Sequence, residues 1–273
     1  MKSNLLTLAK LSLLAFPVLL FSCNDEPDPV TTESKVAVVE EQFEVNAAYE
    51  DIDLLAFDAL QGIGLGARIL TDADICSNTA ITNNALAGKL TIDFGTGCTS
   101  PNGVERKGKI LISYSLAELL QGKISANITL EGYEADGLKI EGIKTITGNL
   151  PSGTSPVSLN VKIENGKVTW PDNSFATYTS TQTRMVTLGE NGSVVITGTA
   201  AGTGREGFAY TALVTEELVL NQECVRTNVF VPSSGKMDFS VLDISVLVDL
   251  GSGTCDKLAT VTYPGGSKEI TLD

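Results

Sequence analysis

The residues best equipped for chemistry in this sequence are its five cysteines and its 33 acidic residues, because the chain contains no histidine. Without histidine, a Ser-His-Asp triad, a Cys-His dyad or a histidine-bearing metal centre is impossible. The acidic residues still allow a glycan hydrolase that uses two carboxylates, but no pair is marked by its spacing. The glycine-rich run 62–66 follows an expected helix instead of a strand, which argues against a phosphate loop. We therefore assign no catalytic residue, no metal site and no cofactor.

Four of the cysteines lie in two similar stretches. Cys76 and Cys224 each precede a Gly-Lys pair, then an aspartate followed by two spaced glycines, and then Cys98 or Cys255. An even number of cysteines in an exported chain indicates disulfides, and four cysteines allow three pairings. The repeated stretch favours Cys76 with Cys98 and Cys224 with Cys255, each closing a local loop worth about 3 to 4 kcal/mol. A metal site is disfavoured because no Cys-x-x-Cys pair occurs.

Asp93 and Asp249 occupy equivalent places in these two stretches, just before the glycines. Aspartate at such a place commonly stabilises a turn by accepting hydrogen bonds from backbone N–H groups. Calcium binding is the alternative, but it requires several more oxygen ligands, and EF-hand spacing is absent.

The stretch from Ser174 to Thr187 is the most suggestive candidate for ligand binding. As one strand it places a row of threonines on one face, and hydroxyl groups near aromatic rings would suit a sugar. The alternative is a solvated strand that uses threonine for its β propensity, and the sequence favours this alternative. The predicted ligand face consists of Trp170, Thr177, Tyr178, Thr179, Thr181 and Thr183.

The first 22 residues have the pattern of a signal segment, with Lys2 and Lys10 before an apolar run from Leu11 to Phe21. A helix over that run would be roughly 18 Å long, too short for about 30 Å of hydrocarbon. The residues Leu20-Phe21-Ser22-Cys23 resemble the lipobox of bacterial lipoproteins. The resemblance implies that Cys23 carries diacylglycerol and an acylated amine, and more than one buried acyl chain gives a stable anchor. An ordinary signal peptide with an incidental cysteine is the alternative.

Removal of the signal segment would take the formal charge from −14 to −16. Such a chain repels nucleic acid, so we predict no nucleic-acid partner. Residues 23–35 are acidic and proline-containing, which predicts a disordered tether. Their acidic residues after Cys23 resemble the signal that sends lipoproteins of the Bacteroidota to the outer face of the outer membrane.

Residues 36–273 are expected to form one β-rich domain, with two β subdomains as the alternative. Apolar residues recur every three or four positions from Asn46 to Gln61, which predicts one helix packed on a sheet. From Gly88 onward, apolar and polar residues alternate with turn signals between them, as in antiparallel strands with one face on a core. The fold class is therefore mainly β, a large antiparallel sheet that forms either a sandwich or a strongly curled meander. Asn165-Gly166 is expected to form a hairpin turn.

Glycines recur in two of the central strands. Gly142 and Gly148, near Ile140, are echoed at a constant offset by Gly198 and Gly204, near Ile196. Glycine inside a strand often marks a bend or bulge, so we expect both strands to be irregular there.

From about Asp72 to the C-terminus, these stretches together resemble uncharacterised lipoproteins of the Bacteroidota. The resemblance implies an exported β-rich protein and lends no catalytic residue. The expected function is a non-catalytic binding or structural module, anchored by lipid in the outer membrane and displayed on the cell surface, with the periplasmic face as the alternative. Its expected partners are the membrane and a glycan or envelope protein, and a carboxylate-based glycan hydrolase is the alternative.

Overall fold

The computed structural model describes residues 31–62, 75–150, 156–187, 192–227, 229 and 231–272. The expected signal segment, Cys23 and most of the expected tether lie outside these residues. The part of the chain from Thr31 onward belongs to one compact unit.

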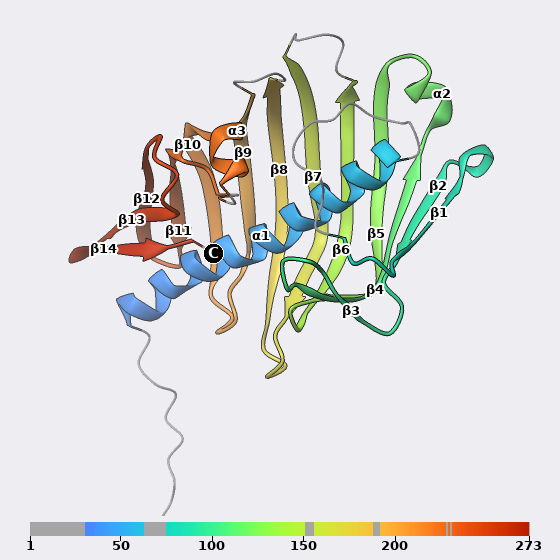
Figure 1. Cartoon of the computed structure of the whole chain (residues 1–273). Helices are drawn as coiled ribbons and strands as arrows, with labels where there is room; N and C mark the ends of the chain where they lie inside the picture. Colours follow the sequence, from blue (N-terminus) through green and yellow to red (C-terminus); the bar gives the residue numbers. More distant parts are fainter. Residues whose placement is uncertain are drawn as a thin grey trace, which may run out of the picture. The chain divides into compact units, whose positions relative to one another are not determined.

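Within the described residues, one antiparallel sheet of 14 strands makes up most of the fold. Strand order follows chain order, except that β3 pairs with β4 and lies off the main path. The predicted antiparallel meander is therefore confirmed, and it is a single open sheet instead of a sandwich (Figure 1). The strands are β1 (Ala80–Asn84), β2 (Lys89–Asp93), β3 (Cys98–Thr99), β4 (Glu105–Tyr114), β5 (Lys123–Ala135), β6 (Leu138–Asn149), β7 (Val157–Thr169), β8 (Phe175–Thr187), β9 (Ser193–Thr203), β10 (Ala209–Asn221), β11 (Ser234–Val241), β12 (Ile244–Ser252), β13 (Leu258–Tyr263) and β14 (Gly266–Thr271).

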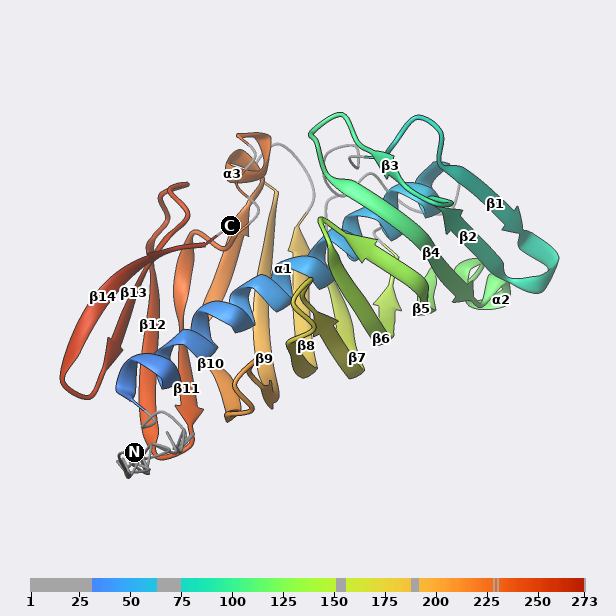
Figure 2. The same cartoon turned by 90° about the horizontal axis from the view of Figure 1, so that it is seen from below.

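The long helix α1 (Thr32–Gly62) lies across one face of this sheet, from the strands near β11 to those near β4 (Figure 2). Its 31 residues correspond to a length of about 46 Å. Among its described side chains only Glu33 and Glu44 are exposed, so the helix packs closely against this face of the curved sheet (Figure 1). The short elements are η1 (Ala85–Ala87), α2 (Leu116–Leu119) and α3 (Gln222–Arg226).

The observed α1 begins 14 residues before the predicted start at Asn46. Its first half contains Val36, Val38 and Val39, which are all buried. Valine has only modest helix propensity, and burial against a sheet overrides such propensities. Residues Thr32–Lys35, expected in the tether, are therefore helical.

The alternation of apolar and polar residues corresponds to the two faces of the sheet. In β7 the apolar residues Val157, Leu159, Val161 and Ile163 are buried, whereas the polar residues between them are half-buried or exposed. The expected hairpin at Asn165-Gly166 is wrong, because β7 continues to Thr169. Asn165 has a φ of 53°, and the register shifts between Ile163 and Gly166, so this pair forms a bulge inside the strand.

The predicted irregularities are confirmed at Gly142 and Gly198. They are not found at the other two glycines, because Gly148 pairs in regular register with β5 and β7, and Gly204 follows the end of β9. Gly142 has a φ of 137° and lies at a register shift in β6. Gly198 has a φ of 141° in β9 and lies beside an interruption in the pairing with β10. A Cβ atom on residue 198 would come within 2.2 Å of the backbone oxygen of Thr181, so only glycine fits there.

Both predicted disulfides are present, Cys76–Cys98 and Cys224–Cys255, with Cα–Cα distances of 6.1 and 5.1 Å. The aspartates of the two stretches have the expected turn role. The Oδ1 atom of Asp93 accepts a hydrogen bond from the N–H of Gly95 at 2.8 Å, and that of Asp249 accepts one from Gly251 at 2.9 Å.

Candidate functional site

A cluster of buried charges joins α1 to the middle of the sheet. The Oδ2 atom of Asp53 on α1 lies 2.6 Å from Nζ of Lys144 on β6 and 2.9 Å from Nη1 of Arg184 on β8. Asp53, Lys144 and Arg184 are only 4%, 2% and 7% exposed. Arg184 also binds both carboxylate oxygens of Glu50, at 2.5 and 2.8 Å. The two acids and the two bases balance, so the cluster is electrically neutral.

Burial shifts the pKa of each charged group in this cluster in the direction that disfavours its charged form, and the neighbouring charges of opposite sign oppose that shift. Burial lowers the pKa of the Lys144 ammonium despite its acidic neighbours, and burial raises the pKa of the Asp53 carboxyl despite Lys144 and Arg184. Burial acts to raise the pKa of Glu50 as well, but Arg184 and Lys144 outweigh it and lower that pKa. The charged groups bind one another, which suits a fixed attachment of the helix better than proton transfer.

Further polar contacts attach α1 along its length. Arg106 of β4 donates to both oxygens of Asp51, at 2.7 and 3.2 Å. Lys268 of β14 lies 2.5 Å from Glu40, and Lys35 pairs with Asp243. Acidic side chains of the helix thus face basic side chains of the sheet at Asp51 and Glu40, and the Lys35–Asp243 pair has the opposite polarity.

The structure separates the residues of the predicted ligand face. Trp170 and Tyr178 are buried on the face of the sheet that carries α1, where Trp170 donates to Glu44 at 3.1 Å and Tyr178 to Asn46 at 3.0 Å. The four threonines point to the opposite face, as the alternation predicts. The two aromatic rings are therefore not available as a stacking surface beside the threonine hydroxyls.

The threonine row itself lies on the outer face, mostly with partners. Thr177 shares a hydrogen bond with Thr203 at 2.8 Å, Thr179 donates to the backbone oxygen of Ala201 at 3.0 Å, and Thr183 donates to Asn160 at 3.4 Å. Thr179 and Thr181 also line a shallow open hollow that extends from β7 to β12. These contacts agree with the interpretation of a solvated strand.

An apolar cavity lies between α1 and the β9–β10 part of the sheet, where the pairing of these strands is interrupted. Leu213 of β10 pairs with Thr199 of β9, but the next pair is Leu218 with Ile196. Four residues of β10 (214–217) therefore lie opposite only two residues of β9 (197–198). Such an irregularity keeps the two strands from closing over the core at this point.

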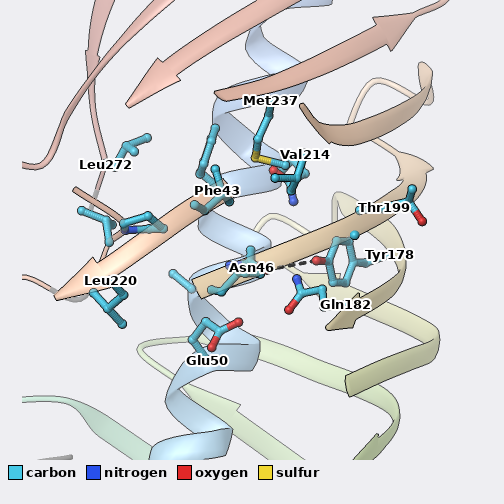
Figure 3. Close-up of a pocket in the computed structure, with 18 residues that line it drawn as sticks. Phe43, Asn46, Glu50, Tyr178, Gln182, Thr199, Val214, Leu220, Met237 and Leu272 are labelled. Atoms are coloured by element: carbon cyan, nitrogen blue, oxygen red, sulfur yellow. Dashed lines mark hydrogen bonds between the residues drawn. The ribbon is translucent and has the colours of Figure 1, made fainter. Parts of the chain in front are cut away.

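The cavity is lined by residues of the helix, of the four strands β8 to β11, of the loop before β11, and by Leu272, which follows β14 (Figure 3). Its volume of about 70 Å³ exceeds the roughly 10 to 15 Å³ that hold one water molecule. Most of the lining is apolar, and the polar groups come from one face of α1, from β8 and from β9. The apolar residues include Phe43, Ile196, Val214, Leu218, Leu220 and Met237, and the polar ones are Gln42, Asn46, Glu50, Gln182 and Thr199.

One polar atom at the cavity is unsatisfied. Gln42 is 3% exposed, and its Oε1 atom has no hydrogen-bond partner in the described part of the chain. A buried acceptor without a donor costs about 1 to 3 kcal/mol. A ligand with an apolar body would cover the lining, and a hydrogen-bond donor on it would satisfy this atom after a small movement of the Gln42 side chain that exposes the oxygen to the cavity.

Sequence reasoning did not identify this cavity. Gln42, Asn46 and Glu50 recur every four residues and so share one helix face, but Gln42 precedes the predicted helix start. Within the described ranges, no set of three metal-binding side chains is arranged around a common point. No described helix is both long and apolar enough to span a membrane.

The fold and this site define a sheet that packs closely against a buried helix and leaves a small apolar cavity beside it. No family model matches the chain, and no curated protein or solved structure matches it. Its function is therefore inferred from its own geometry.

The Asp53→Leu variant should unfold more easily than the wild type by about 3 to 5 kcal/mol, because it leaves Lys144 buried without a counter-charge. Adding Lys144→Met should recover part of this loss, since Arg184 keeps Glu50. Urea unfolding followed by the fluorescence of Trp170 would measure both. Additive losses in the double variant would contradict the coupling.

Burial raises the pKa of Glu41, whose Oε2 atom accepts a hydrogen bond from the N–H of Arg205 at 2.8 Å. A raised carboxyl pKa means that the folded state binds the proton more tightly, so ionisation of Glu41 at neutral pH opposes folding. Glu41→Gln should therefore raise the Tm at pH 7, and the gain should shrink as the pH falls toward about 4.5. The control is Glu33→Gln, which alters an exposed carboxylate of the same helix. A gain independent of pH would contradict this reasoning.

Proposed function

We propose that this chain is a lipid-anchored protein of the bacterial outer membrane whose folded part binds a small ligand without transforming it. The Cys23 motif supports the anchor. The two disulfides support an oxidising, exported location, because such bonds are rare in the cytosol. The acidic residues that follow Cys23 support display at the cell surface.

The observation that carries the binding role is the apolar cavity with its unsatisfied acceptor. Ligand sites are typically concave and apolar with a few polar groups that fix orientation, and this cavity has that composition. Its ligand is an uncharged molecule, or the end of one, with an apolar part and a hydroxyl donor for Gln42. A carboxylate ligand is disfavoured because Glu50 lines the same cavity.

The glycan hydrolase alternative finds less support in this geometry. Glu50 is the one carboxylate among the described residues that line the cavity, and it is paired with Arg184, which also binds Asp53. Turnover of a polysaccharide that single carboxylate substitutions abolish would establish the alternative.

Metabolic labelling with an alkyne analogue of palmitate should mark the wild-type chain and leave Cys23→Ser unlabelled. The Cys76→Ser, Cys98→Ser double variant is a matched control, because it removes two cysteines and keeps Cys23. Equal labelling of the wild type and Cys23→Ser would refute the anchor.

Ligand binding can be followed through the methionines, because Met237 lines the cavity whereas Met185 is 41% exposed. In the Cys23→Ser chain with ¹³C-methyl methionine, 1-butanol should shift the Met237 signal saturably and leave that of Met185 in place. The isomer methyl propyl ether has no donor for Gln42 and should bind about tenfold more weakly, as expected for one hydrogen bond.

The Ala200→Leu variant should abolish the Met237 shift, because residue 200 lines the cavity and a larger side chain fills it. Ala201→Leu alters the next residue, on the opposite face of β9, and should preserve the shift. Equal responses of the two variants, or of the two methionines, would refute the cavity as the binding site.

A further inference from the structure

The two edges of the open sheet differ in how they are protected. Strand β14 carries Lys268 and Glu269, and Lys268 is paired with Glu40 of α1. Strand β1 contains no charged residue and no proline, and its pairing with β2 is regular over all five residues. Charges, prolines and bulges are the usual means of keeping an edge strand from pairing with another chain. β1 lacks all three.

The apolar core also continues to this edge. Ile81 of β1 pairs with Ile92 of β2, which pairs with Ile110 of β4, so the three side chains share the inner face of the sheet. Ile92 and Ile110 are fully buried, whereas Ile81 is 42% exposed. One more strand beside β1 would cover Ile81 and complete the row.

Further exposed apolar side chains lie at the same end of the sheet. Leu86, in the turn that follows β1, is 99% exposed, and Leu120, which ends α2, is 81% exposed. The backbone oxygen of Gly88, at the end of that turn, accepts a hydrogen bond from Tyr114, just before α2. The β1–β2 turn and α2 lie close together in both views (Figures 1 and 2).

We propose that β1 is an acceptor strand, and that an extended segment of another protein adds to it as an antiparallel strand with an apolar side chain opposite Ile81. Hydrogen bonds from the backbone would supply affinity, and alternate side chains would supply specificity. This site is independent of the cavity beside α1.

A second copy of this chain fits the edge less well. Five residues give a strip about 17 Å long and one strand wide, far below the roughly 800 Å² per partner of a stable interface. The formal charge of −14 also opposes contact between two copies.

The test uses the full chain with Cys23→Ser and a fluorescent peptide that copies residues 88–95, the natural antiparallel partner of β1. The peptide should bind saturably below about 1 mM and slow hydrogen exchange at those amides of Ile81–Asn83 that point away from β2. The same peptide with serine in place of its leucine, isoleucine and phenylalanine should not bind.

The Ile81→Lys variant should weaken binding of the peptide at least about tenfold, because it places a charge where an apolar side chain is needed. Leu242→Lys is the matched control, since Leu242 is 54% exposed in the β11–β12 turn, and it should bind as the wild type does. The near-ultraviolet circular dichroism of both variants reports whether they fold.

The proposal would be overturned by three results: no saturable binding, peptide binding that leaves the β1 amides unprotected, or equal binding by the serine peptide. Concentration-dependent dimers that Ile81→Lys abolishes would assign the edge to a second copy instead, and would also overturn it. If Ile81→Lys does not fold, the serine peptide and the hydrogen-exchange data, both measured on the chain with Ile81 intact, still test whether β1 accepts the peptide.

Discussion

The carboxylate of Asp53 holds two bases of the sheet at once, and the position of α1 depends on this contact. Lys144 and Arg184 lie on different strands, so one side chain of the helix fixes its distance from both. A buried ion pair of this kind adds little net stability, because the groups lose their hydration. A displaced helix would leave these charges unpaired in an apolar interior, and so the pairing restricts α1 to one position. This restriction also fixes Gln42 and Asn46, which lie on the same helix and line the cavity.

The sheet contributes the other wall of the cavity through a local defect. Regular pairing of β9 with β10 would bring the strands together and fill the space beside α1. Gly198 permits close contact with Thr181 of β8, while β10 takes a longer path over residues 214–217. The cavity therefore arises from a mismatch between two neighbouring strands, and one small residue allows it.

Much of the fold follows from the alternation of apolar and polar residues, since each strand needs one face on a core. The same pattern correctly predicted that the threonines of β8 and Tyr178 lie on different faces of the sheet. The repeated cysteine stretches correctly predicted both disulfides. The start of α1 was missed because valine has only modest helix propensity and because the polar Gln42 interrupts the apolar spacing that runs from Val38 to Val45.

The site was harder to predict than the fold, because alternation does not show which strands a helix covers. One signal was available: Lys144 occupies a position on the apolar face of β6, two residues before the buried Ile146. A base at such a place requires an acidic partner from another element. The interrupted pairing between β9 and β10 leaves no comparable signal in the sequence. The length of the unpaired segment of β10 depends on the register of β9, β10 and β11 together.

In this meander each strand of the main path forms its hydrogen bonds with the strands next to it in sequence, so the sheet can assemble in the order in which the chain is synthesised. The helix has no such neighbour. Asp53 precedes its partner Arg184 by 131 residues in the chain, and Glu50 precedes the same partner by 134 residues. Before β8 has joined the sheet, the acidic, valine-rich segment that forms α1 lacks its contacts with Arg184. The contacts that fix α1 therefore depend on strands that lie far from it in sequence, whereas each strand pairing of the sheet is local.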